Sequence, residues 1–159
     1  MKIGVISDTH IPTKVKKIPK IVFEVFKDVD LIIHAGDIVE RSVINTLAEY
    51  APVKAVSGNI DPDPFREELS EKLELSLVGY EVAVIHGHNV RGHIMNTLCF
   101  IFPEADIIIF GHTHKPCNQM INGQLHFNPG SATDRRMQKK HSVGVITLGG
   151  KITSEIIEF

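Results

Sequence analysis

The first sixty residues alternate between short apolar runs and amphipathic stretches. Residues 2–7, 31–37 and 53–59 are apolar runs that each end in a polar residue. Between these runs, apolar residues recur at helical spacing over residues 18–29 and again over residues 43–47. Strands that alternate with helices in this way form a parallel sheet with the helices packed against it. The pattern therefore predicts a β-α-β-α-β arrangement for this part of the chain.

Strand patterns dominate the second half of the chain. Residues 72–78 alternate strictly between apolar and polar positions, as a half-buried strand does. Residues 81–88 and 107–110 are further apolar runs, and the second of these is typical of a fully buried strand. Apolar residues share one face of a helix expected over residues 91–102. The dipeptide Asn122-Gly123 is a strong signal for a β-hairpin.

No linker, internal repeat or low-complexity stretch divides the two halves. The run Asp61-Pro62-Asp63-Pro64 interrupts the pattern and is expected to form a loop, and Gly149-Gly150 is expected to turn a final hairpin. A chain of 159 residues is long enough to bury a hydrophobic core. We therefore expect a single domain, residues 1–159, with a layered α/β sandwich fold.

The composition is that of an ordinary globular protein, with 43% hydrophobic and 23% charged residues. A formal net charge of −2 gives no overall field that would favour nucleic acid or an anionic membrane. No apolar run approaches the roughly 18 residues that span a bilayer, and the first residues do not resemble a signal peptide. The two cysteines form no C-x-x-C pair. These features favour a cytoplasmic protein with reduced thiols.

Polar side chains of one chemical kind follow each strand that we expect near the centre of a sheet. Each offers an oxygen or an imidazole nitrogen, and none offers a thiolate. In open α/β sheets, ligands bind in the crevice beyond the carboxyl ends of the strands, so these side chains are expected to converge. They are Asp8, His10, Asp37, Asn59, His86, His112 and His114.

This set of donors favours a metal site over scattered surface residues. A lone Asp-x-His or His-x-His pair is mostly structural, but capping does not explain such pairs at the ends of five strands. Nitrogen and oxygen donors suit divalent transition metals such as Mn²⁺, Fe²⁺, Ni²⁺, Co²⁺ or Zn²⁺. Seven donors are too many for one such ion, and they are enough for two if one carboxylate bridges.

Five motifs carry a resemblance to a known family: Asp8-Thr9-His10, Gly36-Asp37, Gly58-Asn59, His86-Gly87-His88 and Gly111-His112-Thr113-His114. They resemble the motifs of the calcineurin-like metallophosphoesterase superfamily. Their spacing, the chain length and the later run Asn128-Pro129-Gly130-Ser131 are similar to those of its small prokaryotic phosphodiesterase branch. The resemblance implies a four-layer α-β-β-α sandwich of two mixed sheets flanked by helices. It also implies an enzyme that hydrolyses phosphodiester bonds with a hydroxide bridging two metal ions.

The resemblance also implies a role for each donor. One metal ion would be held by Asp8, His10, Asp37 and His114. The other would be held by Asp37, Asn59, His86 and His112, so that Asp37 bridges the pair. Mn²⁺ or Ni²⁺ is favoured as the native metal, and Fe, Co and Zn fit the same donors.

The charge of such a site favours phosphodiesters as substrates. Two divalent cations with the carboxylates of Asp8 and Asp37 and a hydroxide leave a small net positive charge, which a singly charged diester balances better than a doubly charged monoester. Much of the superfamily carries a histidine after Gly-Asn as a helper to the leaving group, but this chain has Ile60. Isoleucine cannot donate a proton, so we expect better turnover of substrates with good leaving groups, such as aryl phosphodiesters. The next residue, Asp61, either orients a ligand or water or caps the Pro62 turn.

Most of the other polar residues have two interpretations. His88 either contacts the metal ligands or the phosphate, which would make it catalytic together with Asp37, Asn59 and His86, or is a plain loop residue. His34 is expected to be a hydrogen-bonded core histidine. The run 128–131 either faces an anion or forms a bare turn. Two basic clusters are solvated faces by default, or else a positive rim that guides a phosphorylated substrate: Lys14, Lys16, Lys17 and Lys20, and Arg135, Arg136, Lys139 and Lys140.

Two other functions compete with a phosphodiesterase acting on a small substrate. The first is a protein-binding scaffold, which the eukaryotic retromer subunit of this fold resembles. A site that no longer catalyses a reaction should have lost at least one metal donor, and all seven are present here. The second is a nuclease, which the acidic balance and the lack of a basic stripe or aromatic platform disfavour. No membrane partner is expected. The sequence does not determine the oligomeric state, and it is compatible with a homo-oligomer.

Overall fold

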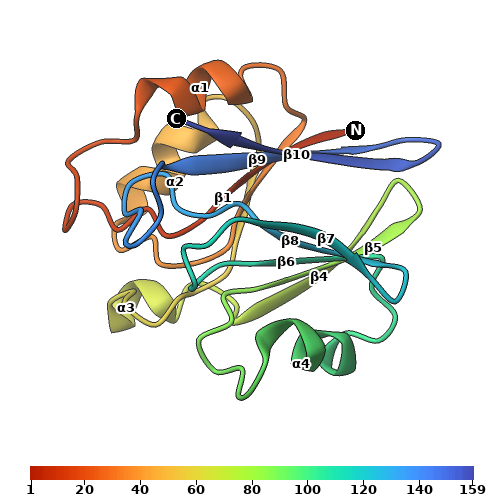
Figure 1. Cartoon of the computed structure of the whole chain (residues 1–159). Helices are drawn as coiled ribbons and strands as arrows, with labels where there is room; N and C mark the ends of the chain where they lie inside the picture. The colour runs from red at the N-terminus through yellow and green to blue at the C-terminus, as the bar shows by residue number, and fades with distance from the viewer.

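Two mixed β-sheets form the centre of the computed structural model, which describes all 159 residues (Figure 1). The first sheet has the strand order β10-β9-β1-β2-β3. Strands β1 (Lys2–Ile6), β2 (Leu31–His34) and β3 (Val53–Ala55) run parallel, whereas β9 (Ser142–Leu148) and β10 (Ile152–Glu158) are antiparallel additions. The predicted β-α-β-α-β start therefore supplies three of the five strands of this sheet.

The second sheet has the strand order β4-β5-β6-β8-β7. Strands β5 (Tyr80–Ile85), β6 (Ile107–Phe110) and β8 (Gln124–Asn128) are parallel, and β4 (Lys72–Leu77) and β7 (Cys117–Ile121) close the two edges as antiparallel strands. The two predicted hairpins are β7-β8 and β9-β10. The parallel strands thus lie in the middle of the second sheet, whereas in the first sheet they extend to the edge at β3.

Helices cover the outer face of each sheet. In Figure 1, α1 (Lys20–Phe26) and α2 (Arg41–Ala48) lie over the first sheet, and α4 (Ile94–Ile101) lies below the second. The short helix α3 (Asp63–Arg66) follows β3. One apolar cluster fills the space between the two sheets. A second lies between the first sheet and its helices, and a third lies between the second sheet and α4. The molecule is therefore the expected four-layer α-β-β-α sandwich.

The apolar runs follow from this layering. Strands β2 and β6 are covered on both faces, and every residue of each is buried; such strands read as continuous apolar runs. In β1, Ile3 and Val5 belong to the cluster between the sheets. Gly4 faces α1, where a Cβ atom would lie 2.8 Å from the ring of Phe26. The close packing of α1 on β1 therefore needs a residue without a side chain at position 4.

Three local predictions differ from the structure. The helices predicted over residues 18–29 and 91–102 are shorter, and form α1 and α4. The loop predicted over residues 61–64 is wrong in its second half, because Asp63-Pro64 begins α3. Proline is tolerated in the first turn of a helix, where its missing N–H would have no partner. Separately, none of the helices has the length and hydrophobicity that crossing a membrane requires.

His34 is the core histidine that the sequence predicts. It is fully buried in β2, and its Nε2 lies 3.0 Å from the hydroxyl of Thr9. Burial lowers the pKa of His34 to about 3, because a charged imidazole would lose its hydration there, and the nearby Asp8 and Asp37 only partly oppose this. The side chain of His34 is therefore neutral in the folded protein near neutral pH.

This buried histidine is expected to destabilise the fold in acid. The pKa of His34 is about 3 in the folded protein against an ordinary value of 6.5, so between these values the unfolded chain binds more protons. The free energy of unfolding should therefore fall with decreasing pH, by up to about 1.4 kcal/mol per pH unit from this residue alone. Urea unfolding from about pH 7 to about pH 4 should show a shallower slope for His34→Gln. An unchanged slope, like that expected for the exposed-site control His93→Gln, would contradict the prediction.

Candidate metal centre

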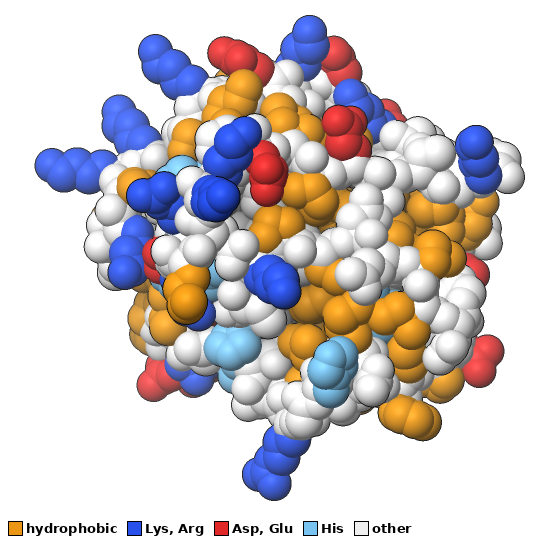
Figure 2. Space-filling model, viewed as in Figure 1, with side chains coloured by type: hydrophobic (Ala, Val, Ile, Leu, Met, Phe, Trp, Pro, Cys, Tyr) orange, Lys and Arg blue, Asp and Glu red, His pale blue; other side chains and the backbone are white.

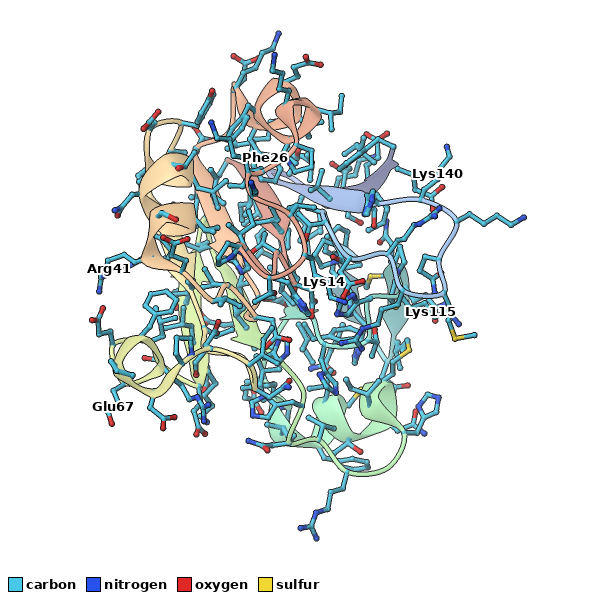
Figure 3. All side chains as sticks on the ribbon, turned by 90° about the vertical axis from the view of Figure 1, so that its left-hand side faces the viewer. Lys14, Phe26, Arg41, Glu67, Lys115 and Lys140 are labelled. Carbon is cyan, nitrogen blue, oxygen red and sulfur yellow. The ribbon has the colours of Figure 1, made fainter.

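The seven predicted donors lie together at one edge of the sandwich. Asp8 and His10 follow β1, Asp37 follows β2, and Asn59 follows β3. His86 comes directly after β5, and His112 and His114 follow β6. Figure 3 looks onto this edge, where Lys14 in the loop after β1 and Lys115 in the loop after β6 both appear. The carboxyl ends of parallel strands from both sheets therefore supply one site.

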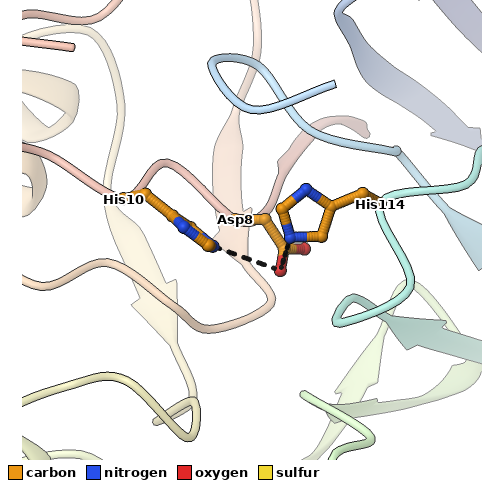
Figure 4. A group of neighbouring side chains, drawn as sticks. All are labelled: Asp8, His10 and His114. Carbon is orange, nitrogen blue, oxygen red and sulfur yellow. Dashed lines mark ion pairs between the residues drawn. The ribbon is translucent and has the colours of Figure 1, made fainter. Parts of the chain in front are cut away.

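Asp8 lies between two histidines (Figure 4). Its Oδ1 is 3.1 Å from Nε2 of His114 and 3.7 Å from Nε2 of His10. Nε2 of His10 is also 3.3 Å from Oδ2 of Asp37. All four residues are buried. Asp8, His10 and His114 are close enough together for their ligand atoms to surround one ion.

Asp37 also faces a second group of donors. Its Oδ1 lies 3.3 Å from Nε2 of His86, which in turn is 3.2 Å from Oδ1 of Asn59. His112 lies beside this group, with 5.2 Å between its ring centroid and that of His86, and it is only partly buried. Each carboxylate oxygen of Asp37 thus points to a different histidine, one in each group.

Several buried atoms of these residues have no hydrogen-bond partner. They include Oδ1 of Asp8, Nε2 of His10, Oδ2 of Asp37, Nε2 of His114 and Nδ1 of His112. Buried polar atoms in folded proteins nearly always have a partner, so such a concentration of unpaired atoms needs an explanation. Divalent cations would satisfy these oxygen and nitrogen atoms together. The residues present therefore fit metal ions.

The backbone at the site adopts a conformation that side-chain-bearing residues rarely take. The φ angles are +52° at Asp8, +47° at His10, +57° at Asp37, +64° at His112 and +58° at His114. Asp and His tolerate the left-handed region better than most residues, but it still costs about 1 kcal/mol or more at each. Strain concentrated on these residues is typical of a functional site, where the fold holds side chains in directions that a relaxed loop would not give.

Two glycines in the predicted motifs leave room for neighbouring donors. A Cβ atom on Gly58 would lie 2.1 Å from Oδ1 of Asp37, and one on Gly111 would lie 2.9 Å from Oδ2 of Asp8. Neither approach is possible for a real side chain. The glycine before Asn59 and the glycine before His112 therefore allow loops from different strands to meet.

Charge pairing shifts the pKa values of the donors. Burial opposes the ionised form of Asp8 and Asp37, but the adjacent histidines outweigh it and hold both pKa values well below the usual range. Burial likewise opposes the charge on His10, yet Asp37 and Asp8 raise its pKa to about 9. His86 also has a raised pKa, again from Asp37 and Asp8 against the effect of burial. Both carboxylates are thus ionised, and cations binding here would displace protons from the histidines.

The chain matches the model of the calcineurin-like phosphoesterase superfamily domain over residues 1–151. It belongs to this superfamily. A probable metallophosphoesterase of Methanothermobacter thermautotrophicus is 39% identical over 160 residues, which cover 99% of this chain and 92% of the relative. A phosphodiesterase of Methanocaldococcus jannaschii is 31% identical over 143 residues, which cover 82% of this chain and 83% of the relative. The family resemblance expected from the five motifs is confirmed.

A solved structure supports the fold assignment of this phosphoesterase. Wild-type Vps29 of Entamoeba histolytica, in complex with zinc, superimposes with a TM-score of 0.83 over 99% of each chain. The two sequences are 22% identical, so the likeness concerns the fold. The four-layer sandwich implied by the family resemblance is therefore confirmed as the fold of this chain.

Asp134 is a residue of the site that the sequence pattern does not reveal. Its backbone oxygen accepts a hydrogen bond from Nδ1 of His114, which leaves Nε2 of that ring free to face Asp8. Its carboxylate lies 3.7 Å from Nδ1 of His10 and 3.6 Å from Nζ of Lys14. Asp134 therefore orients two predicted ligands of the phosphoesterase from a loop far along the chain.

The run 128–131 forms hydrogen bonds to the backbone of the loops that carry Asp8 and His112. The hydroxyl of Ser131 donates to the backbone oxygen of Asp8 at 2.8 Å, and Nδ2 of Asn128 donates to the backbone oxygen of Gly111 at 2.8 Å. Both side chains are buried. The run is thus neither a bare turn nor an anion contact through its hydroxyl, because Ser131 uses that hydroxyl inside the protein.

Asp61 fits the first of its two expected roles, because it holds the loops that carry two of the predicted ligands. Its carboxylate is buried and accepts hydrogen bonds from the backbone N–H groups of Ile38 at 2.7 Å, Val39 at 2.6 Å and Gly58 at 2.7 Å. It therefore does more than cap the Pro62 turn. It joins the loop that carries Asp37 to the loop that carries Asn59.

His88 lies beside the second group of donors. Its ring centroid is 5.4 Å from that of His86 and 6.3 Å from that of His112, and its buried Nδ1 has no hydrogen-bond partner.

Among the basic residues, Arg136 donates from Nη1 to the backbone oxygen of His112 at 3.3 Å. The 134–140 loop therefore borders the metal centre directly.

Proposed function

We propose that this phosphoesterase is a two-metal phosphodiesterase that hydrolyses small phosphodiesters. The observation that carries the proposal is the position of Asp37, whose two carboxylate oxygens each lie 3.3 Å from a histidine of a different group. A carboxylate in this position suits the bridge of a dinuclear site. The phosphodiesterase name of a relative at 31% identity supports the same bond class.

The proposed ligand sets follow the two groups. One ion would be held by Asp8, His10, Asp37 and His114. The other would be held by Asp37, Asn59, His86 and His112. We favour Mn²⁺ or Ni²⁺ as the native metal, and Fe, Co and Zn suit the same nitrogen and oxygen donors.

Bound divalent ions would lower the pKa of water and neutralise the charge of a phosphoryl group. The chain itself fixes the directions of the donors. The backbone oxygen of Asp134 sets the tautomer of His114, and Asp61 sets the separation of the loops bearing Asp37 and Asn59. His88, with its unpaired Nδ1 beside His86 and His112, is the residue we propose to contact the substrate phosphate.

The residue after Asn59 limits the leaving groups. Ile60 is 40% exposed, and its backbone N–H donates to Oδ1 of Asp37 at 3.1 Å. Its side chain can neither donate a proton nor bind an oxygen. We therefore propose that substrates whose leaving group departs without protonation, such as aryl phosphodiesters, are cleaved fastest.

The proposal is tested with metal-stripped protein, an aryl phosphodiester and the matching aryl monoester. Mn²⁺, Ni²⁺, Co²⁺, Zn²⁺ or Mg²⁺ is added back separately. We expect Mn²⁺ or Ni²⁺ to restore hydrolysis, with a higher kcat/KM for the diester. Folded protein that hydrolyses neither substrate with any metal would reject the enzyme. A higher kcat/KM for the monoester would keep the metal site but reject the proposed bond class.

A protein-interaction scaffold is the second candidate. Large apolar side chains are exposed at Phe100 (85%), Met120 (62%) and Met137 (95%). Single exposed apolar residues are common, yet these three are large and mostly exposed. The structural likeness to Vps29 fits such a role. Inactive but metal-binding protein in the hydrolysis test would favour this candidate.

A further inference from the structure

A hollow lies beside the loop that carries His10 and shares no residue with the metal centre. Its volume is about 480 Å³, and it opens between the 11–18 loop, α1 and α2. Ile11, Ile18 and Val43 form an apolar floor, and each of them is buried. Phe23 completes this floor. Clefts that hold small molecules have volumes of about 300–1,000 Å³, so the hollow has the size of a ligand site.

Three lysines line the hollow and give it a positive charge. Lys16, Lys17 and Lys20 belong to its lining, which contains no acidic residue. None of the three forms an ion pair, since the lysines that do so are Lys14, Lys27 and Lys72. Lysine and arginine side chains gather over the upper left of the face seen in Figure 2. Three unpaired ammonium groups around one hollow favour a ligand with several negative charges.

The start of α2 adds polar groups to the same wall. Ser42 and Thr46 line the hollow. The hydroxyl of Thr46 donates to the backbone oxygen of Ser42, while the hydroxyl of Ser42 has no protein partner. No side chain caps α2, whose first residue is Arg41. Free backbone N–H groups at a helix start favour a nearby anion, and they act here in the same direction as the lysines.

These features together select a class of ligand. A purely inorganic anion would make no use of the apolar floor, and an apolar compound would leave the lysines unpaired. An apolar floor with one aromatic ring, a free hydroxyl and three positive charges match a flat ring, a sugar and a pair of phosphates. A nucleoside diphosphate carries about three negative charges at neutral pH, as expected from its phosphate pKa values near 6.

We propose that this hollow is a second ligand site, which binds a nucleoside diphosphate. Ile11 in the floor directly follows His10, so the bound ligand contacts the loop that carries a residue of the metal centre. The phosphates lie against Lys16, Lys17 and Lys20, and the ring lies on the apolar floor.

The experiment uses the full chain in the presence of a chelator, so that metal ions do not bind phosphate. Binding of a fluorescent ADP analogue is followed by polarisation, with displacement by unlabelled ADP, adenosine or inorganic pyrophosphate. We expect saturable binding and displacement by ADP at a concentration at least about tenfold lower than for adenosine or pyrophosphate, because only ADP uses both halves of the site. Equal displacement by pyrophosphate would show binding by charge alone and would overturn the proposal.

Variants locate the binding site. The triple change Lys16→Ala, Lys17→Ala and Lys20→Ala should weaken binding at least about tenfold, since it removes every cation of the hollow. Ser42→Asp should do the same by placing a carboxylate in the wall, and an acid in the first turn of α2 does not destabilise the helix. Lys139→Ala with Lys140→Ala is the control for loss of charge elsewhere, and it should change the affinity by less than about twofold.

Three results would reject the site. The first is no saturable binding by folded protein. The second is an affinity for the ADP analogue that is the same in the triple lysine variant and in Ser42→Asp as in the control variant. The third is loss of binding in Asp37→Ala, which would assign the nucleotide to the metal centre. Equally strong displacement by an acidic peptide would show that the surface binds a protein segment, and this too would overturn the proposal.

Discussion

Replacing Asp37 with alanine is expected to abolish metal-dependent hydrolysis of an aryl phosphodiester, with a fall in kcat/KM on the order of 10³-fold or more. Asp37 is buried, and its two oxygens face His10 and His86, each at 3.3 Å. The carboxylate of Asp8 also comes within 4.8 Å of the ligand atoms of Asp37 and His86, but the histidines in contact with it, His10 and His114, both belong to the first group. Without Asp37, the histidines keep their places but no longer share an anion that can hold two cations close together.

The measurement combines activity with metal content. Metal bound per chain, determined by elemental analysis after dialysis, should fall from two ions to fewer than one in Asp37→Ala, and Asp37→Asn should lie between because its amide keeps one acceptor oxygen. Asp28→Ala removes an exposed acid and serves as the control, with both quantities unchanged. Full activity of Asp37→Ala would show that the bridge, and with it the two-metal assignment, is wrong.

The positions of the candidate metal ligands could be predicted because they follow from the strands. Asp37 comes three residues after His34, the last residue of β2, and His112 comes two residues after β6. Parallel strands that are buried on both faces have recognisable apolar runs, and their carboxyl ends meet at one edge. A polar residue next to the end of such a run is therefore placed in space by the sheet itself.

The residues that hold these donors in place could not be predicted in the same way. Asp134 lies in an irregular loop, yet it contacts His10 and His114. Polar residues in a polar loop carry no periodic signal, and their partners depend on how that loop crosses the sheet edge. The start of α3 was missed for a related reason, since Asp63-Pro64 is equally common in turns and in first helical turns.

His112 marks the remaining limit of the sequence pattern. The motif places it beside His86, with 5.2 Å between their ring centroids, close to the 5.0 Å between those of His10 and His114. However, His112 is less buried than His114, two residues later. A strand end determines which residues reach the edge, whereas the side-chain direction depends on the left-handed backbone angle at each one.

Asp61 should contribute strongly to both stability and metal binding, although it contacts neither metal nor substrate. Its buried carboxylate accepts three backbone hydrogen bonds, from Ile38, Val39 and Gly58. Asp61→Ala leaves these N–H groups without partners, and each unpaired buried donor costs about 1–3 kcal/mol. We therefore expect the metal-free protein to lose about 3 kcal/mol or more of unfolding free energy, measured by urea unfolding.

A purely structural role would stop at that loss, whereas a positioning role also changes metal affinity. Val39 and Gly58 are close in sequence to Asp37 and Asn59, so loosening their loops increases the spread of distances between the two predicted ligands. Metal affinity by calorimetric titration should fall about 10–100-fold in the fraction that remains folded, as for other residues that orient ligands. Asp63→Ala, an exposed acid two residues away, should leave both quantities unchanged. Reduced stability with unchanged metal affinity would contradict the positioning role. It would mean that the two loops keep their separation without Asp61, because ligands that move apart cannot bind the metal equally well.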